Sequence, residues 1–171
     1  GTPTDSVLLG VQEVMKSARP DMLLSGINRG GNLGEDITYS GTVAAAMEGT
    51  LLGLPSVALS QHYKDRQKMS WKTAEVWMAR ALKSLLKEDW PAGVLMNVNF
   101  PDVPPGAVAG IEVSHQGRRK IGGALTEGKD PRGDKYFWIG PQRDEDEFKT
   151  GTDLSVVTAG GIAVTPLSLD L

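Results

Sequence analysis

The sequence has no cysteine, no long apolar run and no excess of basic residues. The absence of cysteine excludes disulfide bonds, a thiolate nucleophile, zinc–thiolate sites and iron–sulfur clusters. It also suits a reducing compartment, so we expect a cytoplasmic protein. No apolar run approaches the roughly 18 residues of a membrane helix, and no basic leader with a following apolar stretch indicates a signal peptide. With 18 Lys and Arg against 21 Asp and Glu, the net charge is −3, which makes DNA a poor candidate partner.

Glycine is the residue in excess, with 21 of 171 positions against an average of about 7%. Such an excess indicates turns, close backbone approaches or ligand loops. The length corresponds to about one domain. Hydrophobic residues make up 40% and charged residues 23% of the chain, as in ordinary globular proteins.

Strand and helix signals alternate along the first hundred residues. Thr2, Pro3 and Asp5 form a capping box with proline at the first helical position. A later helix is expected to bury Trp71 and Trp77, which lie at helical spacing. The predicted elements are helices at 2–19, 40–53 and 70–89 and buried strands at 22–24, 56–60, 94–100 and 162–167. This order predicts an α/β fold, a Rossmann-like three-layer sandwich with a mainly parallel sheet.

The character of the chain changes after Pro101. Residues 101–150 hold many glycines, prolines and charged residues, with short strand-like pieces at 111–114 and 136–139. We interpret this range as an extended β-hairpin or arm subdomain. Residues 1–100 then form the Rossmann-like core, and residues 151–171 return a strand that completes it.

The loop at 25–42 carries the strongest functional signal. It follows a buried strand and leads into a helix N-terminus, and ligands of open α/β sheets bind at that edge. The unpaired amides and partial positive charge of a helix N-terminus favour a phosphate group. Ser40 and Thr42 add hydroxyl donors, and Gly41 allows a ligand to approach the backbone.

Asn28 and Asn32 project carboxamides from the same loop. A simpler interpretation is that Ser40 only caps the helix and that the glycines only make the turn. The pattern alone does not decide between the two, because a glycine-rich loop between strand and helix is common.

Other signals are weaker. Residues 123–129 have the spacing of a Walker A loop but lack the Ser or Thr that would hold magnesium and the preceding buried strand, so we treat the match as chance. Asn97 and Asn99 share one face of a strand, where hydrogen bonding to adjacent loops is the favoured interpretation. His62 and His115 show no metal spacing, and surface or structural roles are expected for both.

The stretch PDMLLSGINRGGNLGEDITYSGTVAAAMEGTLLGLPSVALS, at 20–60, closely resembles the SurE family of survival-protein nucleotidases. Members of that family are divalent-metal-dependent phosphatases of nucleoside monophosphates. Shorter matching stretches are GTPTD at 1–5, MNVNFP at 96–101, DPRG at 130–133, YFWIG at 136–140, GTD at 151–153 and VTPLSLDL at 164–171. The similarity extends over essentially the whole chain, more loosely between 101 and 150.

The resemblance implies roles for particular residues. Asn28 matches the asparagine of the SGIN motif, a ligand in the family to one divalent cation per site, with Mg²⁺ or Mn²⁺ expected. Asn32 matches an asparagine of the phosphate pocket. Ser40, Gly41 and Thr42 match the SGT step that lines the same pocket.

The other family ligands are two adjacent aspartates of an NDDG-type motif and a serine from a later loop, and neither motif occurs in this sequence. The resemblance places both upstream of GTPTD. We therefore expect the 171 residues to belong to a longer protein, which also continues beyond the last strand and whose catalytic base or nucleophile, of unknown identity, lies in the missing N-terminal segment. A single carboxamide cannot hold Mg²⁺ or Mn²⁺, so the 171 residues alone are expected to lack metal-dependent activity.

The resemblance implies a phosphomonoesterase that converts nucleoside 5′-monophosphates, with 3′-monophosphates as a second substrate class, to nucleoside and phosphate. Two alternatives stay open. One is a non-catalytic module that binds nucleotide phosphate through the loop at 25–42. The other is an oligomerisation module in which 101–150 is an exchanged arm, and the family implies a homodimer or homotetramer.

Overall fold

A computed structural model describes residues 1–88, 90–119, 125–139 and 148–169. Its centre is a five-stranded sheet in the order β1-β2-β3-β7-β4. The strands are β1 (Leu23–Arg29), β2 (Ser56–Gln61), β3 (Val94–Phe100), β7 (Ile162–Ser168) and β4 (Ile111–Val113). The pairings β1–β2, β2–β3 and β4–β7 are parallel, and β3–β7 is antiparallel. The predicted α/β class with a mainly parallel sheet is therefore confirmed.

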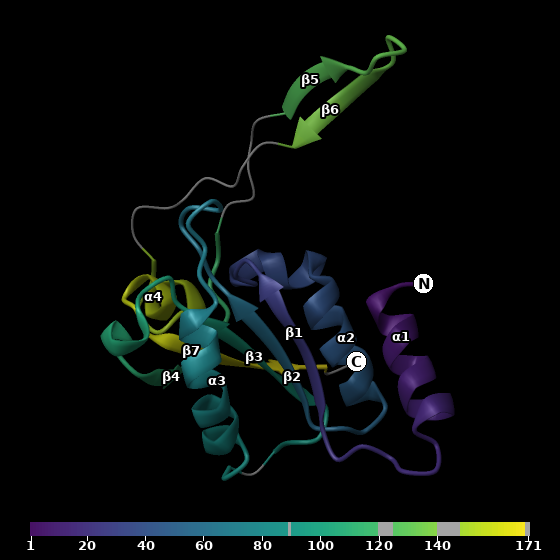
Figure 1. The fold of residues 1–171 in the computed structure, drawn as a ribbon, viewed down its shortest axis with the longest axis vertical. Helices are drawn as coiled ribbons and strands as arrows, with labels where there is room; N and C mark the ends of the chain where they lie inside the picture. Colours follow the sequence, from purple (N-terminus) through teal and green to yellow (C-terminus); the bar gives the residue numbers. More distant parts are fainter. Residues whose placement is uncertain (89, 120–124, 140–147, 170–171) are drawn as a thin grey trace.

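Helices cover both faces of this sheet (Figure 1). They are α2 (Gly41–Leu51), α3 (Lys72–Leu85) and α4 (Asp153–Thr158), while α1 (Pro3–Leu9) packs against the outside of α2. On one face α2 packs Val43 and Ala46 against Ala58 and Leu95 of the sheet. On the other face, residues of α3 pack against the alternate residues of the same strands; this cluster includes Ala74, Ala81, Leu85, Val57, Leu59, Val98 and Phe100. Since successive side chains of a strand point to opposite faces, the sheet is apolar on both sides, and three layers result.

Local sequence signals placed the starts of α1 and α2 correctly, while α3 begins at Lys72, two residues after the predicted start. Thr2 accepts a hydrogen bond from the amide of Asp5, whose side chain in turn accepts from the amide of Thr2, which completes the predicted capping box. Ser40 caps α2 by accepting from the amide of Val43. The first helix departs from the prediction, because α1 ends at Leu9 and continues as a π-helical segment, Gly10–Val14.

Trp71 was expected in the core, and this prediction is wrong. It stands at the N-cap position of α3, before the first helical residue, and is 38% exposed. Trp77, further along the same helix, packs against the core and donates from Nε1 to the carbonyl oxygen of Pro105. The amphipathic period therefore begins at the helix start and does not include the residue that precedes it.

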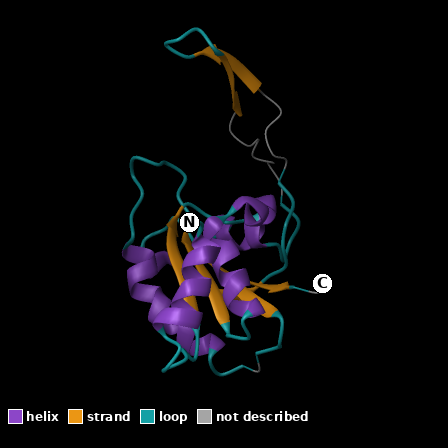
Figure 2. Cartoon of the chain, turned by 90° about the vertical axis from the view of Figure 1, so that its right-hand side faces the viewer, coloured by secondary structure: helices purple, strands orange, loops and turns teal. Residues whose placement is uncertain are grey.

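Strands β5 (Leu125–Lys129) and β6 (Lys135–Ile139) form a separate antiparallel hairpin. Two views at right angles show it projecting away from the sheet and its helices (Figures 1 and 2). The predicted arm range 101–150 thus contributes both this hairpin and β4, which pairs with β7 in the central sheet. Of the Walker-like stretch, residues 125–129 form strand β5, and residues 123–124 lie outside the described residues.

Candidate functional site

The candidate site lies at the carboxyl end of β1. The strand continues beyond the predicted 22–24 as far as Arg29, with an irregular register between Ser25 and Asn28. Gly26, at a φ of 126°, permits this course, because a Cβ there would collide with the carbonyl oxygen of Leu59. The peptide bond from Gly26 to Ile27 is cis. The loop that the sequence indicated is therefore partly strand, and it delivers Asn28 to the sheet edge.

Asn28 is half-buried. Its carboxamide nitrogen donates a 2.9 Å hydrogen bond to the carbonyl oxygen of Gly30. It lies in register with Ser60 of β2, which in turn lies in register with Asn99 of β3. Three polar residues thus form a row across the carboxyl ends of three neighbouring parallel strands, the edge at which such sheets bind ligands.

Asn32 holds the bend after β1, at residues 30–34, against this row. Its side-chain nitrogen donates to Oγ of Ser60 at 2.7 Å, and its backbone amide donates to Oδ1 of Asn99 at 2.8 Å. Its carbonyl oxygen accepts from Nδ2 of both Asn97 and Asn99, at 2.8 and 3.1 Å. These bonds confirm the expected pairing of Asn97 and Asn99 with an adjacent loop. Asn32 is only 5% exposed, and its side-chain nitrogen, backbone amide and carbonyl oxygen all bond to other residues of the protein.

Asp153, at the start of α4, holds the next part of the bend and was not singled out by the sequence. Its side chain is fully buried. One carboxylate oxygen accepts from the amide of Gly34, and the other accepts from the amides of Gly117 and Leu154, all at 2.8 Å. Burial raises the pKa of Asp153 above its ordinary value near 3.8, although these three amides and nearby His115 act to lower it.

A second segment, residues 114–119, lies against the same bend. The amide of Arg119 donates to Oε2 of Glu35 at 2.6 Å, and its guanidinium lies 3.5 Å from Oδ2 of Asp36. Nε2 of Gln116 donates to the carbonyl oxygen of Gly34 at 2.9 Å. Glu35 and Asp36 are therefore engaged by this segment.

Ser40, Gly41 and Thr42 lie at the N-terminus of α2, as predicted. The hydroxyl oxygen of Ser40 accepts from the amide of Val43 at 3.1 Å, so the capping role is shown. Gly41 has a packing neighbour, since a Cβ there would lie 3.0 Å from Cγ of Pro3. Ser40 and Thr42 are half-buried and Gly41 is exposed, which leaves this helix end open to a ligand.

No group of three or more His, Asp or Glu side chains within the described residues could hold a metal ion. Asn28 supplies one neutral oxygen donor of the type that Mg²⁺ and Mn²⁺ accept. His62 lies beside Gly31, and His115 is bridged to Thr152 through the backbone. In the part of the chain that the structure describes, no helix is long and apolar enough to cross a membrane.

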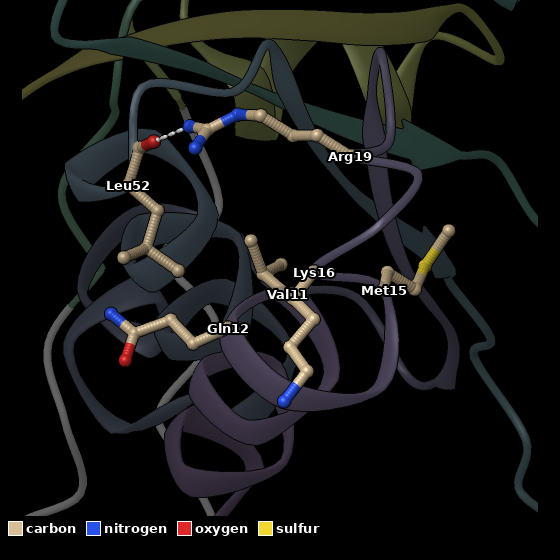
Figure 3. Close-up of a pocket in the computed structure, with 6 residues that line it drawn as sticks. All are labelled: Val11, Gln12, Met15, Lys16, Arg19 and Leu52. Carbon is tan, nitrogen blue, oxygen red and sulfur yellow. Dashed lines mark hydrogen bonds between the residues drawn. The ribbon is translucent and has the colours of Figure 1, made fainter.

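A cavity of about 270 Å³ lies elsewhere, between the first helical segment and the end of α2 (Figure 3). Arg19 reaches across it and donates to the carbonyl oxygen of Leu52. Lys16 pairs with Glu13 at 3.2 Å on the exposed surface. The cavity is a crevice between two packed helical segments, and none of the predicted site residues lines it.

Comparison with known proteins gives consistent results. The family model described as "Survival protein SurE" matches residues 1–123. The 5′-nucleotidase SurE of Paramagnetospirillum magneticum is 58% identical over 171 residues, and that of Rhodospirillum rubrum is 50% identical over 174. Both alignments cover 100% of this chain and 66% of the relative. The crystal structure of the SurE protein from Aquifex aeolicus is similar with a TM-score of 0.84 and 40% identity, over 100% of this chain and 68% of that one.

Proposed function

Since this chain belongs to the SurE family, we propose that it is part of a nucleotidase, a metal-dependent phosphomonoesterase that hydrolyses nucleoside 5′-monophosphates. Nucleoside 3′-monophosphates are proposed as a second substrate class. The observation that carries the proposal is half-buried Asn28 at the carboxyl end of β1, followed in the chain by the exposed N-terminus of α2, within a chain 58% identical to a protein named 5′-nucleotidase SurE.

Asn28 is proposed as one ligand of a divalent cation, Mg²⁺ or Mn²⁺. Its carboxamide nitrogen donates a hydrogen bond to the carbonyl oxygen of Gly30. This bond orients the carboxamide and leaves its oxygen as the atom that binds the cation. An amide oxygen fits these hard cations. The chain spans about 66% of the length of two curated relatives, and the remaining ligands and the base or nucleophile are assigned to the part of the protein outside these 171 residues. When bound, such a cation polarises a phosphoryl oxygen and lowers the pKa of a bound water.

The N-terminus of α2 is proposed to hold the phosphate. The first amides of a helix have no partner within the helix, and the helix dipole favours an anion there. The amides of Gly41 and Thr42 and the hydroxyls of Ser40 and Thr42 are the donors for the phosphate oxygens. Donors fixed before the reaction stabilise the charge that spreads over these oxygens in the transition state. Asn32 is proposed to complete the pocket by keeping the bend in place, as its four hydrogen bonds support.

The test uses the whole protein that contains this chain. Release of phosphate from AMP is measured with added Mn²⁺, with added Mg²⁺ and with a chelator. Metal-dependent turnover is expected. Binding of AMP without turnover at any metal concentration would favour the non-catalytic alternative instead.

A second function, assembly through the hairpin, has its own observation. Leu125, Tyr136, Phe137 and Trp138 of the hairpin are 66%, 47%, 60% and 68% exposed. By the register of the hairpin, Tyr136 and Trp138 lie on one face and Leu125 and Phe137 on the other. An isolated two-stranded hairpin is marginal in water, and exposed apolar side chains on its faces mark interaction sites. We propose that a second copy of the protein covers them, in a homodimer or homotetramer.

A further inference from the structure

The buried carboxylate of Asp153 joins three segments that are far apart in the sequence. It bonds to Gly34, which is 119 residues away, to Gly117, which is 36 residues away, and to Leu154 beside it. The first two contacts bring the bend after β1 and the segment 114–119 onto the start of α4. All three acceptor contacts are short and made to backbone amides, so they fix the backbone rather than flexible side chains.

Gly34 lies midway along the chain between Asn28, the proposed cation ligand, and Ser40, beside the proposed phosphate donors. Its φ of 54° is left-handed, and a Cβ there would lie 3.4 Å from the carbonyl oxygen of Gly117. The two glycines therefore pack closely enough for one carboxylate to bind both amides. A contact at this midpoint restrains both ends of the loop.

Burying the carboxylate of Asp153 at this junction costs free energy, because its charge is removed from water. None of the ion pairs among the described residues includes Asp153, and burial outweighs the favourable influence of nearby His115 on its carboxylate, so keeping this charge buried is costly. Three charge-assisted hydrogen bonds offset part of that cost. A group whose burial is this unfavourable is best explained by the geometry that it imposes.

We infer that Asp153 is a positioning residue for the phosphate site, holding the loop between Asn28 and Ser40 in its binding geometry through the amide of Gly34. This inference rests on the proposed function for its catalytic consequence, but the positioning itself can be measured separately. Asp153 is fully buried and bonded to backbone amides, so it is assigned a positioning role and no contact with the cation or the phosphate. Its effect is transmitted through Gly34 and, by way of Gly117, through the segment that pairs with Glu35 and Asp36.

The experiment compares Asp153→Asn with Thr152→Ala in the whole protein. The Asp153→Asn variant keeps the shape of the side chain but replaces one acceptor oxygen by an N–H donor, so at least one of the three amides loses its bond. Thr152 caps the same helix by accepting from the amide of Ser155 at 3.2 Å, and its side chain bonds to neither Gly34 nor Gly117. Thr152→Ala therefore weakens α4 while leaving the carboxylate in place.

Two readouts are used. Amide hydrogen exchange measured by NMR is expected to be about tenfold faster at Gly34 or Gly117 in Asp153→Asn than in Thr152→Ala, which corresponds to one lost hydrogen bond. Competitive inhibition by inorganic phosphate is expected to weaken in Asp153→Asn, with a higher KM for AMP and a smaller change in kcat. Unchanged exchange at both glycines would overturn the inference. Equal kinetic losses in the two variants would also overturn it, because the effect would then come from α4 stability alone.

If the wild-type protein showed no turnover, the proposed function would fail. The exchange experiment would still decide whether Asp153 positions the loop.

Discussion

The carboxamide nitrogen of Asn28 donates a 2.9 Å hydrogen bond to the carbonyl oxygen of Gly30, two residues further along the chain. This short-range bond orients a side chain that also lies in register with Ser60 of the neighbouring strand. The orientation is therefore set before any cation arrives, and it has a direct consequence for substitutions at this position.

Asn28→Ala is expected to weaken cation affinity in the whole protein by at least roughly tenfold. Substitution of residues that only hydrogen-bond to a metal ligand already causes a loss of that size, and Asn28 is proposed as a ligand itself. Activity measured across a Mn²⁺ titration should recover in part at high metal concentration. Asn28→Asp is the comparison variant: it keeps an oxygen ligand, loses the bond to Gly30 and adds a negative charge, so it should retain metal binding better than Asn28→Ala does. Unchanged metal dependence in Asn28→Ala would remove the residue from the site.

Ser40→Ala is expected to destabilise the protein by about 1 kcal/mol, because the amide of Val43 loses its cap. The KM for AMP should rise as well, since one proposed phosphate donor is removed. Ser40→Thr is the matched control because threonine retains a capping hydroxyl. Urea unfolding and steady-state kinetics separate the two effects, and a stability loss with an unchanged KM would leave Ser40 as a cap only.

The titration of Asp153 gives a pH dependence with a defined sign. Burial raises the pKa of this carboxyl in the folded state above its ordinary value near 3.8. A raised pKa means that the folded protein binds the proton more tightly than the unfolded chain does. The stabilisation from protonation is fully present below pH 3.8 and is lost as the pH rises through the folded-state pKa.

Asp153→Asn does not titrate at this position. The free energy of unfolding of the wild type, minus that of Asp153→Asn, should therefore decrease as the pH is raised from below 3.8 toward neutrality. Urea unfolding of both proteins across this range provides the measurement. A difference that stays constant or increases with pH would contradict the direction of the shift.

Gly49 is expected to be intolerant of even a methyl group. It lies on the buried face of α2, where a Cβ would meet Oγ of Ser56 at 2.5 Å and Cδ1 of Leu23 at 2.9 Å. Gly49→Ala should destabilise the protein by about 1–3 kcal/mol through overpacking. Gly10→Ala is the control, because nothing lies within 4 Å of its Cβ position and its backbone is helical, so it should add about 0.4–1 kcal/mol of stability. Chemical unfolding of both variants measures the contrast.

Trp138→Ser tests the hairpin as a contact between copies. Trp138 is 68% exposed in the single chain, so the substitution should leave the fold intact and shift the protein toward smaller species in size-exclusion chromatography. Lys129→Ser, on the neighbouring strand of the same hairpin, should elute like the wild type. Co-elution of all three proteins would exclude Trp138 from an interface.

The sequence predicted the features that depend on neighbouring residues. The helix starts at Thr2 and Ser40 were correct because capping is decided within one turn of helix. The parallel strands were correct because buried strands are short apolar runs between turn residues. The prediction for Trp71 failed because the spacing of apolar residues does not show where the helix begins, and Trp71 precedes its first residue.

Contacts between segments that are far apart in the sequence could not be predicted from these local patterns. Asp153 could be identified in the sequence only as the first residue of a capped helix, since its partners Gly34 and Gly117 are defined by the fold. The engagement of Glu35 by the amide of Arg119 was hidden for the same reason. The roles of Asn28, Ser40 and Thr42 in binding stay predictions, while their positions at one edge of the sheet are now described.

Strand β7 is the last strand in the described part of the chain, yet it lies inside the sheet, between β3 and β4. During synthesis, which proceeds from the N-terminus, β3 has its outer edge open and β4 has no neighbour to join until Ile162–Ser168 leaves the ribosome. Open strand edges recruit other chains. A nascent chain that ends upstream of Ile162 therefore exposes these edges, and we expect it to aggregate more readily than a chain that includes β7.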